Sequence, residues 1–146
     1  MKSNANFYSI EKNHDINLCI CSLIKKLFKK SENIILIDSK SRLESLDRLL
    51  WSFEQNSFLP HKIYYDGDNL DTPILLLSIE QLDKLESFND YKSIINNYDN
   101  ALLRLKNDFN IYEFVDNTDE NKSLSRKKFL EYKKNNFRLV HSIYNE

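Results

Sequence analysis

Two uninterrupted apolar runs constrain the fold of this 146-residue chain more than any other feature. Residues 34–37 read Ile-Ile-Leu-Ile, and residues 74–77 read Ile-Leu-Leu-Leu. A strand exposed on one side alternates apolar and polar residues, whereas a parallel strand covered on both faces is apolar throughout. Helical periodicity both precedes and follows the first run, which is typical of alternating strands and helices. The two runs therefore predict an α/β fold with a mostly parallel sheet.

The other elements follow from hydrophobic periodicity and from turn residues. The predicted helices cover residues 16–28, 41–53, 101–109 and 119–136, and residues 78–89 form a short helix or a covering loop. The predicted strands cover residues 6–10, 34–37, 58–65, 74–77, 91–97 and 111–115, and we expect the last of these to be the final strand. Predicted helix caps are Asn13, the capping-box pair Ser41 and Glu44, and residues 116–118. Because no linker or repeat interrupts the pattern, we expect residues 1–146 to form a single domain.

Gly67 is the only glycine in the chain. Phosphate-binding loops need several glycines, because only a backbone without Cβ atoms approaches the ligand closely enough. Neither the GxGxxG pattern nor the P-loop pattern can be written in this sequence. The sequence therefore lacks a dinucleotide-binding glycine motif, and we expect no cofactor.

The residues that most often perform catalysis or bind metal are scattered. His14, His61 and His141 lie far apart in the sequence and suggest neither a metal site nor a catalytic triad. Cys19 and Cys21 lie two positions apart in a helical pattern, which predicts one core thiol and one near the surface rather than a disulfide or a zinc site. We expect no catalytic residues and no metal.

Charge and hydropathy narrow the class of protein further. The net charge of −1 argues against a surface built as a whole for nucleic acid. No apolar run approaches the roughly 18 residues of a membrane span, and residues 1–6 lead into no signal-peptide segment. We therefore expect a cytoplasmic protein that does not contact a membrane.

Large side chains crowd a predicted corner between the second helix and the third strand. Trp51 falls outside the apolar stripe of its helix, and Phe58, Leu59, Pro60 and His61 follow soon after. Buried cores seldom need this combination, whereas rigid aromatic side chains supply contact area in protein interfaces. We interpret the corner as a protein-binding patch, and we expect the His61 imidazole to be packed or capped.

The final predicted helix carries a cationic stripe. Lys122, Arg126, Phe129 and Lys133 share one helical face, and Glu131 is the only acid between Lys122 and Lys134. A solvated helix face normally mixes both signs of charge, so an external anion is expected. A nucleic-acid backbone and an acidic peptide both fit, although one helix is short for duplex DNA. A helix that is basic only for solubility and for its dipole is the remaining alternative.

Several segments resemble the chi subunit of bacterial DNA polymerase III. The signature is the run Leu46-Asp47, Leu50-Trp51-Ser52-Phe53 and Ser57-Phe58-Leu59-Pro60-His61, whose spacing is more specific than any one piece. Residues 7–8, 73–76 and 109–116 are also similar to the family, whereas residues 79–88 differ from it. The resemblance implies a Rossmann-like three-layer sandwich without nucleotide binding. It also implies a non-catalytic accessory subunit of the polymerase III holoenzyme, which acts in DNA replication.

The resemblance further implies two protein partners. The first is the psi subunit of the clamp loader, and the implied psi-binding residues are Trp51, Phe58, Leu59, Pro60 and His61. The second is the acidic C-terminal tail of single-stranded-DNA-binding protein (SSB), and the implied tail-binding residues are Lys122, Arg126, Phe129 and Lys133. Phe129 stands where a Tyr is common in the family, and Leu130 stands where a Lys is frequent, so Lys133 is expected to supply the missing cation.

The implied state is a monomer or a heterodimer with psi that meets DNA mainly indirectly. The alternative function is a module that binds single-stranded nucleic acid directly through the basic C-terminal helix.

Overall fold

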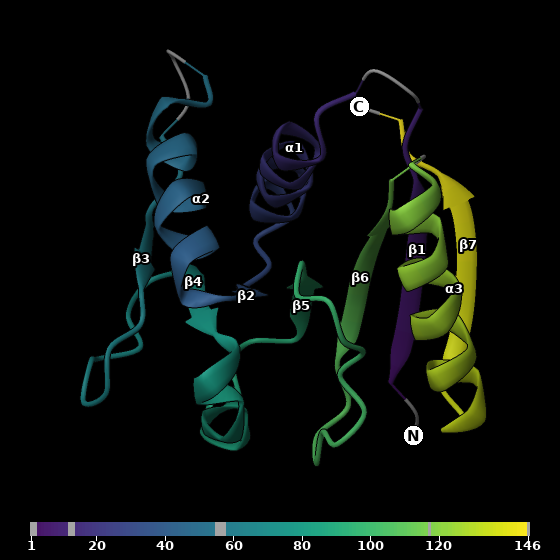
Figure 1. Ribbon diagram of the computed structural model, residues 1–146. Helices are drawn as coiled ribbons and strands as arrows, with labels where there is room; N and C mark the ends of the chain where they lie inside the picture. Colours follow the sequence, from purple (N-terminus) through teal and green to yellow (C-terminus); the bar gives the residue numbers. More distant parts are fainter. Residues whose placement is uncertain (1–2, 12–13, 55–57, 117, 146) are drawn as a thin grey trace.

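Within the described part of the chain, seven strands form one sheet in the order β3-β4-β2-β5-β6-β1-β7, and all neighbouring strands are parallel (Figure 1). The computed structural model describes residues 3–11, 14–54, 58–116 and 118–145. The strands are β1 (Asn4–Ser9), β2 (Ile34–Asp38), β3 (His61–Ile63), β4 (Ile74–Ser78), β5 (Ser93–Asn96), β6 (Asn110–Val115) and β7 (Arg138–Ile143). The helices are α1 (Ile16–Lys29), α2 (Lys40–Ser52), the 3₁₀ helix η1 (Ile79–Ser87) and α3 (Asp119–Lys134). The predicted α/β class is confirmed.

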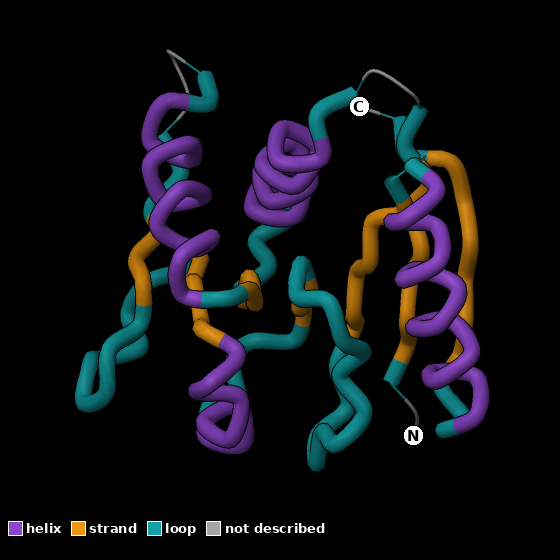
Figure 2. Tube along the Cα trace, viewed as in Figure 1, coloured by secondary structure: helices purple, strands orange, loops and turns teal. Residues whose placement is uncertain are grey.

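Each face of the sheet has its own helical cover (Figure 2). Ile34 and Leu36 of β2 belong to the core beneath α1 and α2, whereas Ile35 and Ile37 belong to the core on the side of η1 and α3. Because both faces are covered, β2 and β4 are buried at every position, which explains their continuous apolar sequence. The three-layer arrangement implied by the family resemblance is thereby confirmed.

The helices begin at caps that the sequence predicted only in part. Thr118 caps α3 as expected, since its side chain accepts a hydrogen bond from the Asn121 N–H. The predicted box of Ser41 and Glu44 is wrong, because α2 begins directly after β2 and Ser39 takes the N-cap position. The predicted cap Asn13 lies outside the described residues; Asp15 caps α1.

Residues 101–109 form an irregular segment instead of the predicted helix. Leu102 and Phe109 are buried in the core on the α3 side, so their apolar spacing reflects contact with the sheet rather than a helix stripe. The Leu102 N–H donates to the Tyr132 hydroxyl at 3.1 Å, which satisfies a backbone group without a helical hydrogen bond. For residues 78–89 the sequence allowed either a short helix or a covering loop, and the structure has the short 3₁₀ helix η1 there.

Strand β7 was not predicted, and β6 is therefore not the final strand. Asn136 has a positive φ of 64° just after the end of α3, and this left-handed residue lets the chain reverse into β7. The strand lies at the sheet edge beside β1 and is largely exposed, so its sequence lacks the apolar run of a buried strand. The opposite edge strand, β3, directly follows Pro60, where a proline is tolerated.

Both cysteines are buried in the core beneath α1, so the prediction of a near-surface thiol is wrong. Burial raises the pKa of the Cys21 thiol to about 12, with a smaller contribution from the negative charge of Asp15. Both thiols are free, and neither forms a disulfide.

Candidate functional site

A buried polar cluster fixes α3 against the sheet. The Glu113 carboxylate of β6 is 1 % exposed and accepts hydrogen bonds from Tyr132 at 2.6 Å, Asn96 at 2.7 Å and Lys128 at 2.8 Å. Burial raises the pKa of Glu113, although Lys128 and the other two donors act in the opposite direction. Because three donors converge on this carboxylate, one side of α3 has a defined position relative to the strands.

This cluster changes the interpretation of one cation. Lys128 is one of six Lys and Arg residues from Lys122 to Lys134, but its ammonium pairs with Glu113 and donates to the Tyr98 carbonyl. Its side chain is only 11 % exposed. Lys128 therefore stabilises the core side of α3 and is not available to an external anion.

A pocket of about 430 Å³ lies between α3 and the strands β6, β1 and β7. We name it the α3 pocket, and its lining residues are Phe7, Ser9, Val115, Lys122, Ser125, Arg126, Phe129 and His141. Phe7 holds the Phe129 ring edge-on, with the ring centroids 5.3 Å apart. The aromatic rings give the pocket an apolar wall, and Lys122 and Arg126 add positive charge.

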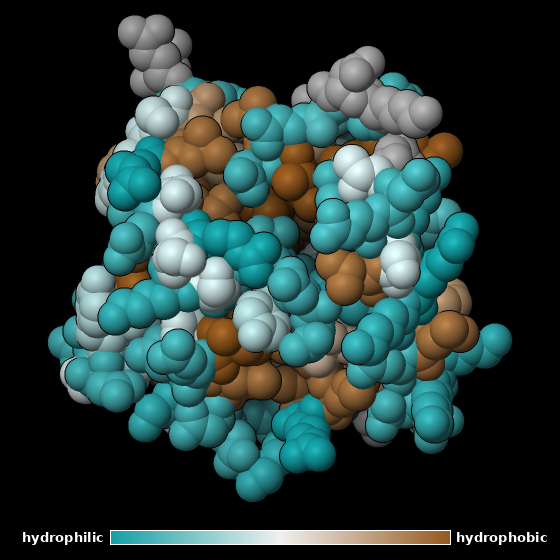
Figure 3. All heavy atoms as spheres, viewed as in Figure 1, coloured by the Kyte–Doolittle hydropathy of each residue, from teal (hydrophilic) through white to brown (hydrophobic). Residues whose placement is uncertain are grey.

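The structure brings together three of the four residues predicted from the cationic stripe. Lys122, Arg126 and Phe129 line the α3 pocket, whereas Lys133 does not line it and lies exposed near the end of α3. Among the described residues, neither Lys122 nor Arg126 forms an ion pair with an acid of the chain. Figure 3 shows hydrophilic residues covering most of the surface over α3, with apolar residues visible between them.

Five lining residues were not identified as site residues from the sequence: Phe7, Ser9, Val115, Ser125 and His141. Ser9 at the end of β1 and His141 of β7 meet in the α3 pocket, with the Ser9 hydroxyl 2.7 Å from Nε2 of His141. Recognition of residues 138–143 as a strand would have been needed to place His141 beside Phe7, its register partner on β1. No motif signalled this position.

The second predicted site, at the corner between α2 and β3, presents two exposed aromatic rings. Trp51 is 52 % exposed and Phe58 is 72 % exposed, with ring centroids 6.0 Å apart; we name this pair the aromatic corner. The ring of His61 packs against Trp51 at 4.0 Å, with Nδ1 2.6 Å from the Leu59 carbonyl. Leu59 and His61 are buried and Pro60 is half-buried, so the expectation of a packed imidazole is confirmed.

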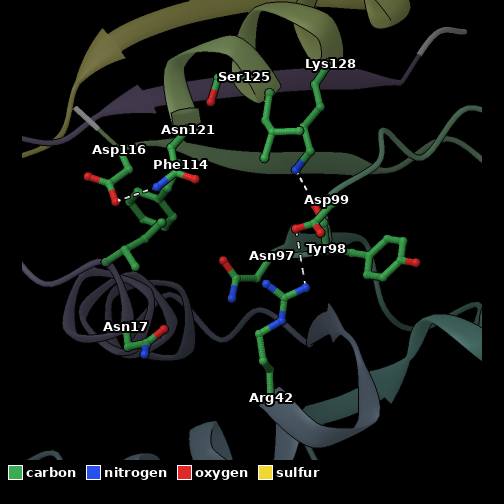
Figure 4. A pocket seen from close by; sticks show the side chains of 12 residues that line it. Asn17, Arg42, Asn97, Tyr98, Asp99, Phe114, Asp116, Asn121, Ser125 and Lys128 are labelled. Carbon is green, nitrogen blue, oxygen red and sulfur yellow. Dashed lines mark hydrogen bonds and ion pairs between the residues drawn. The ribbon is translucent and has the colours of Figure 1, made fainter. Parts of the chain in front are cut away.

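A further pocket of about 290 Å³ lies at the carboxyl ends of β5 and β6 (Figure 4). This is the edge at which open α/β sheets commonly bind ligands. Three of its charged side chains form ion pairs within the chain: Arg42 lies 3.0 Å from Asp38 and 3.4 Å from Asp99, and Lys128 pairs with Glu113. The fourth, Asp116, accepts a hydrogen bond from the Asn121 side chain at 3.1 Å. The charged groups of this pocket therefore already have partners within the chain and are less available to a ligand.

Within residues 3–11, 14–54, 58–116 and 118–145, no group of three or more His, Cys, Asp or Glu side chains is arranged to hold a metal ion. None of the described helices is both long and apolar enough to cross a membrane.

The fold and the two surfaces define a class: a Rossmann-like α/β protein whose exposed features are an aromatic pair and a cationic pocket. The chain belongs to the DNA polymerase III chi subunit (HolC) family, whose model matches residues 1–140. This is a family of non-catalytic accessory subunits of the replicative polymerase.

Comparison with solved structures adds support for the fold alone. The crystal structure of T4 UvsW is similar with a TM-score of 0.65 and 12 % sequence identity, covering 99 % of this chain. The chain spans only 41 % of that structure, and identity this low says nothing of function. A search of curated proteins found no match.

Proposed function

We propose that this protein links the clamp loader, through psi, to the acidic C-terminal tail of SSB. Membership of the chi family supports a place in the polymerase III holoenzyme. The observation that supports the tail site is the α3 pocket, in which Lys122 and Arg126 flank an aromatic wall without an acid partner among the described residues. We also propose that residues 1–146 act as one domain in the cytoplasm, as a monomer or a heterodimer with psi.

The chemistry of the α3 pocket fits an acidic peptide that ends in an aromatic residue. The guanidinium of Arg126 presents a planar set of donors that matches a carboxylate in two hydrogen bonds. Phe7 and Phe129 offer apolar area beside it for the terminal aromatic side chain. Leu130 is 62 % exposed and carries no charge, so Lys133 is the next cation along α3 that can meet acids upstream of the peptide end.

A peptide titration tests this proposal. A fluorescein-labelled acidic octapeptide ending in Phe should bind the full chain with a dissociation constant in the micromolar range (about −8 kcal/mol) and more weakly at high salt. Arg126→Ala should weaken binding by about tenfold or more, since a charge-assisted hydrogen bond is worth about 1.5–3 kcal/mol. Lys127→Ala is the matched control, because Lys127 is exposed but does not line the pocket. Equal loss in both variants, or no anisotropy change at low salt, contradicts the tail site.

We propose that psi binds at the aromatic corner. Trp51 and Phe58 provide the exposed contact area. Large apolar side chains that are exposed side by side often mark a protein-binding surface. Leu59 and His61 are buried beneath them and would act by holding the two rings in place, with Pro60 at the margin.

Direct binding of single-stranded nucleic acid is the second candidate, favoured by the exposed cations Lys127, Lys133 and Lys134 on α3. An unstructured oligonucleotide of thymidines would then bind more tightly than the acidic peptide and show a steep dependence on salt. The same anisotropy assay distinguishes the two functions. We expect the peptide to bind more tightly.

A further inference from the structure

Strand β7 leaves an open edge on the sheet. Among the described residues it pairs only with β1, and its six residues, Arg138 to Ile143, include neither proline nor glycine. The other edge strand, β3, has three residues and follows a proline, which limits its pairing with another chain. The β7 edge is therefore the better template for an added strand.

The hydrogen bonds to the β1 side establish which groups of β7 face outward. The Arg138 N–H donates to the Ser3 carbonyl at 3.1 Å, and the Tyr144 N–H donates to the Ser9 carbonyl at 2.9 Å. Backbone groups of successive residues in a strand point to opposite edges. Leu139, His141 and Ile143 therefore present their N–H and C=O groups to the open edge.

The same three residues place their side chains on the α3 side of the sheet. Leu139 and His141 are in register with Ala5 and Phe7, which belong to the core on that side, and His141 lines the α3 pocket. A strand paired to β7 would thus lie beside the α3 pocket, because β7 is the edge strand and contributes His141 to the pocket lining. In the described structure, no other element covers the outer side of β7 (Figure 1).

The charge beside this edge is strongly positive. Together α3, β7 and the turn between them, residues 119–143, contain seven Lys and Arg residues and three acids, Asp119, Glu120 and Glu131, of which the first two lie in the first turn of α3. One of these cations, Lys128, is engaged with Glu113. Lys133, Lys134 and Arg138 are exposed around the turn that connects α3 to β7, near the start of the strand.

We propose that an extended acidic peptide pairs with β7 as an eighth, parallel strand whose C-terminal end enters the α3 pocket. The parallel direction places the end of the peptide beside His141 and Arg126, and it places the preceding acidic residues beside Lys133, Lys134 and Arg138. Backbone hydrogen bonds to Leu139, His141 and Ile143 supply affinity that does not depend on peptide sequence. The inference rests on the proposed tail site and adds how the peptide is held outside the pocket.

Amide hydrogen exchange of the full chain, measured by NMR, tests the pairing. A saturating acidic octapeptide ending in Phe should slow exchange of the Leu139, His141 and Ile143 amides by about tenfold or more. The Val140 and Ser142 amides face β1 and serve as internal controls whose exchange should change little. Protection of the three amides that grows with protein concentration without peptide would show a second copy on this edge and overturn the proposal.

Methylation of the peptide nitrogens gives an independent test that leaves the protein unchanged. Pairing to one edge predicts that methyl groups at alternate positions weaken binding by about tenfold, while those at the intervening positions have little effect. Binding that depends on Arg126 but shows neither amide protection nor this alternation overturns the strand pairing and leaves the tail site standing. Absence of any peptide binding overturns both.

Discussion

Glu113 and Lys128 form the buried ion pair that connects β6 to α3. Replacing Lys128 with Met leaves the carboxylate buried without its charge partner, and breaking a buried pair in this way costs roughly 3–5 kcal/mol. We expect urea unfolding of Lys128→Met to show a loss of that size. Lys127→Met, the exposed neighbour, should stay within about 0.5 kcal/mol of the wild type.

The raised pKa of Glu113 gives the stability of the protein a dependence on pH. Burial is the main cause, so the folded protein holds this proton at a higher pH than the unfolded chain, whose carboxyl has the ordinary pKa of 4.5. The contribution of Glu113 is therefore largest at low pH and is lost as pH rises through the folded-state value.

Comparison of the wild type with Glu113→Gln isolates this contribution. The free energy of unfolding of the wild type, minus that of the variant, should increase when the pH is lowered from neutral toward about 5. Asp38, whose pKa is also raised by burial, is present in both proteins and cancels. A difference that stays constant or decreases on acidification would contradict the assignment.

At the scale of elements, the sequence predicted correctly those helices and strands whose buried faces produce a clear apolar pattern. The apolar runs of β2 and β4 and the periodicity of α1 and α2 were recognised because these elements contact the core along most of their length. Strand β7 was missed because it is mostly exposed, and with it the pocket residue His141. Residues 101–109 were mistaken for a helix because apolar residues that cover a sheet can share helical spacing by chance.

The corner between α2 and β3 offers a matched pair of neighbours with opposite burial. Phe58 is 72 % exposed and Leu59 is 4 % exposed. Phe58→Ala should leave the free energy of unfolding of the isolated protein within about 0.5 kcal/mol of the wild type, whereas Leu59→Ala should lower it by roughly 2–5 kcal/mol. In a co-purification assay with psi, the folded Phe58→Ala variant should lose binding. Retention of psi at wild-type levels would contradict the proposed surface.

At the scale of the whole molecule, the two proposed sites lie at opposite edges of the sheet. The aromatic corner adjoins β3, whereas the α3 pocket lies over β6, β1 and β7, so β4, β2 and β5 separate the two sites. The edge strands β3 and β7 lie at opposite sides of the view in Figure 1. Neighbouring strands are about 4.8 Å apart, so the edges are separated by roughly 29 Å. Two partners can therefore occupy the protein without touching the same residues.

Independent binding is the expected consequence. Isothermal titration calorimetry of the acidic peptide into the chain alone and into its psi complex should give dissociation constants within about twofold of each other. The reason is that the two sites share no residues, so we expect no coupling free energy between them. A shift of tenfold or more would show that the sites communicate or overlap.

The position of β1 has a consequence for how this protein is made. The strand lies between β6 and β7, so residues 4–9 have no partner strand until β6, residues 110–115, has left the ribosome, and the second partner, β7, is made last. During synthesis, β1 therefore remains unpaired while β2, β3 and β4, which neighbour one another in the sheet, can already assemble. A translation pause or a premature stop before β6 would leave β1, with its core residues Ala5 and Phe7, without neighbouring strands and exposed to chaperones and to aggregation.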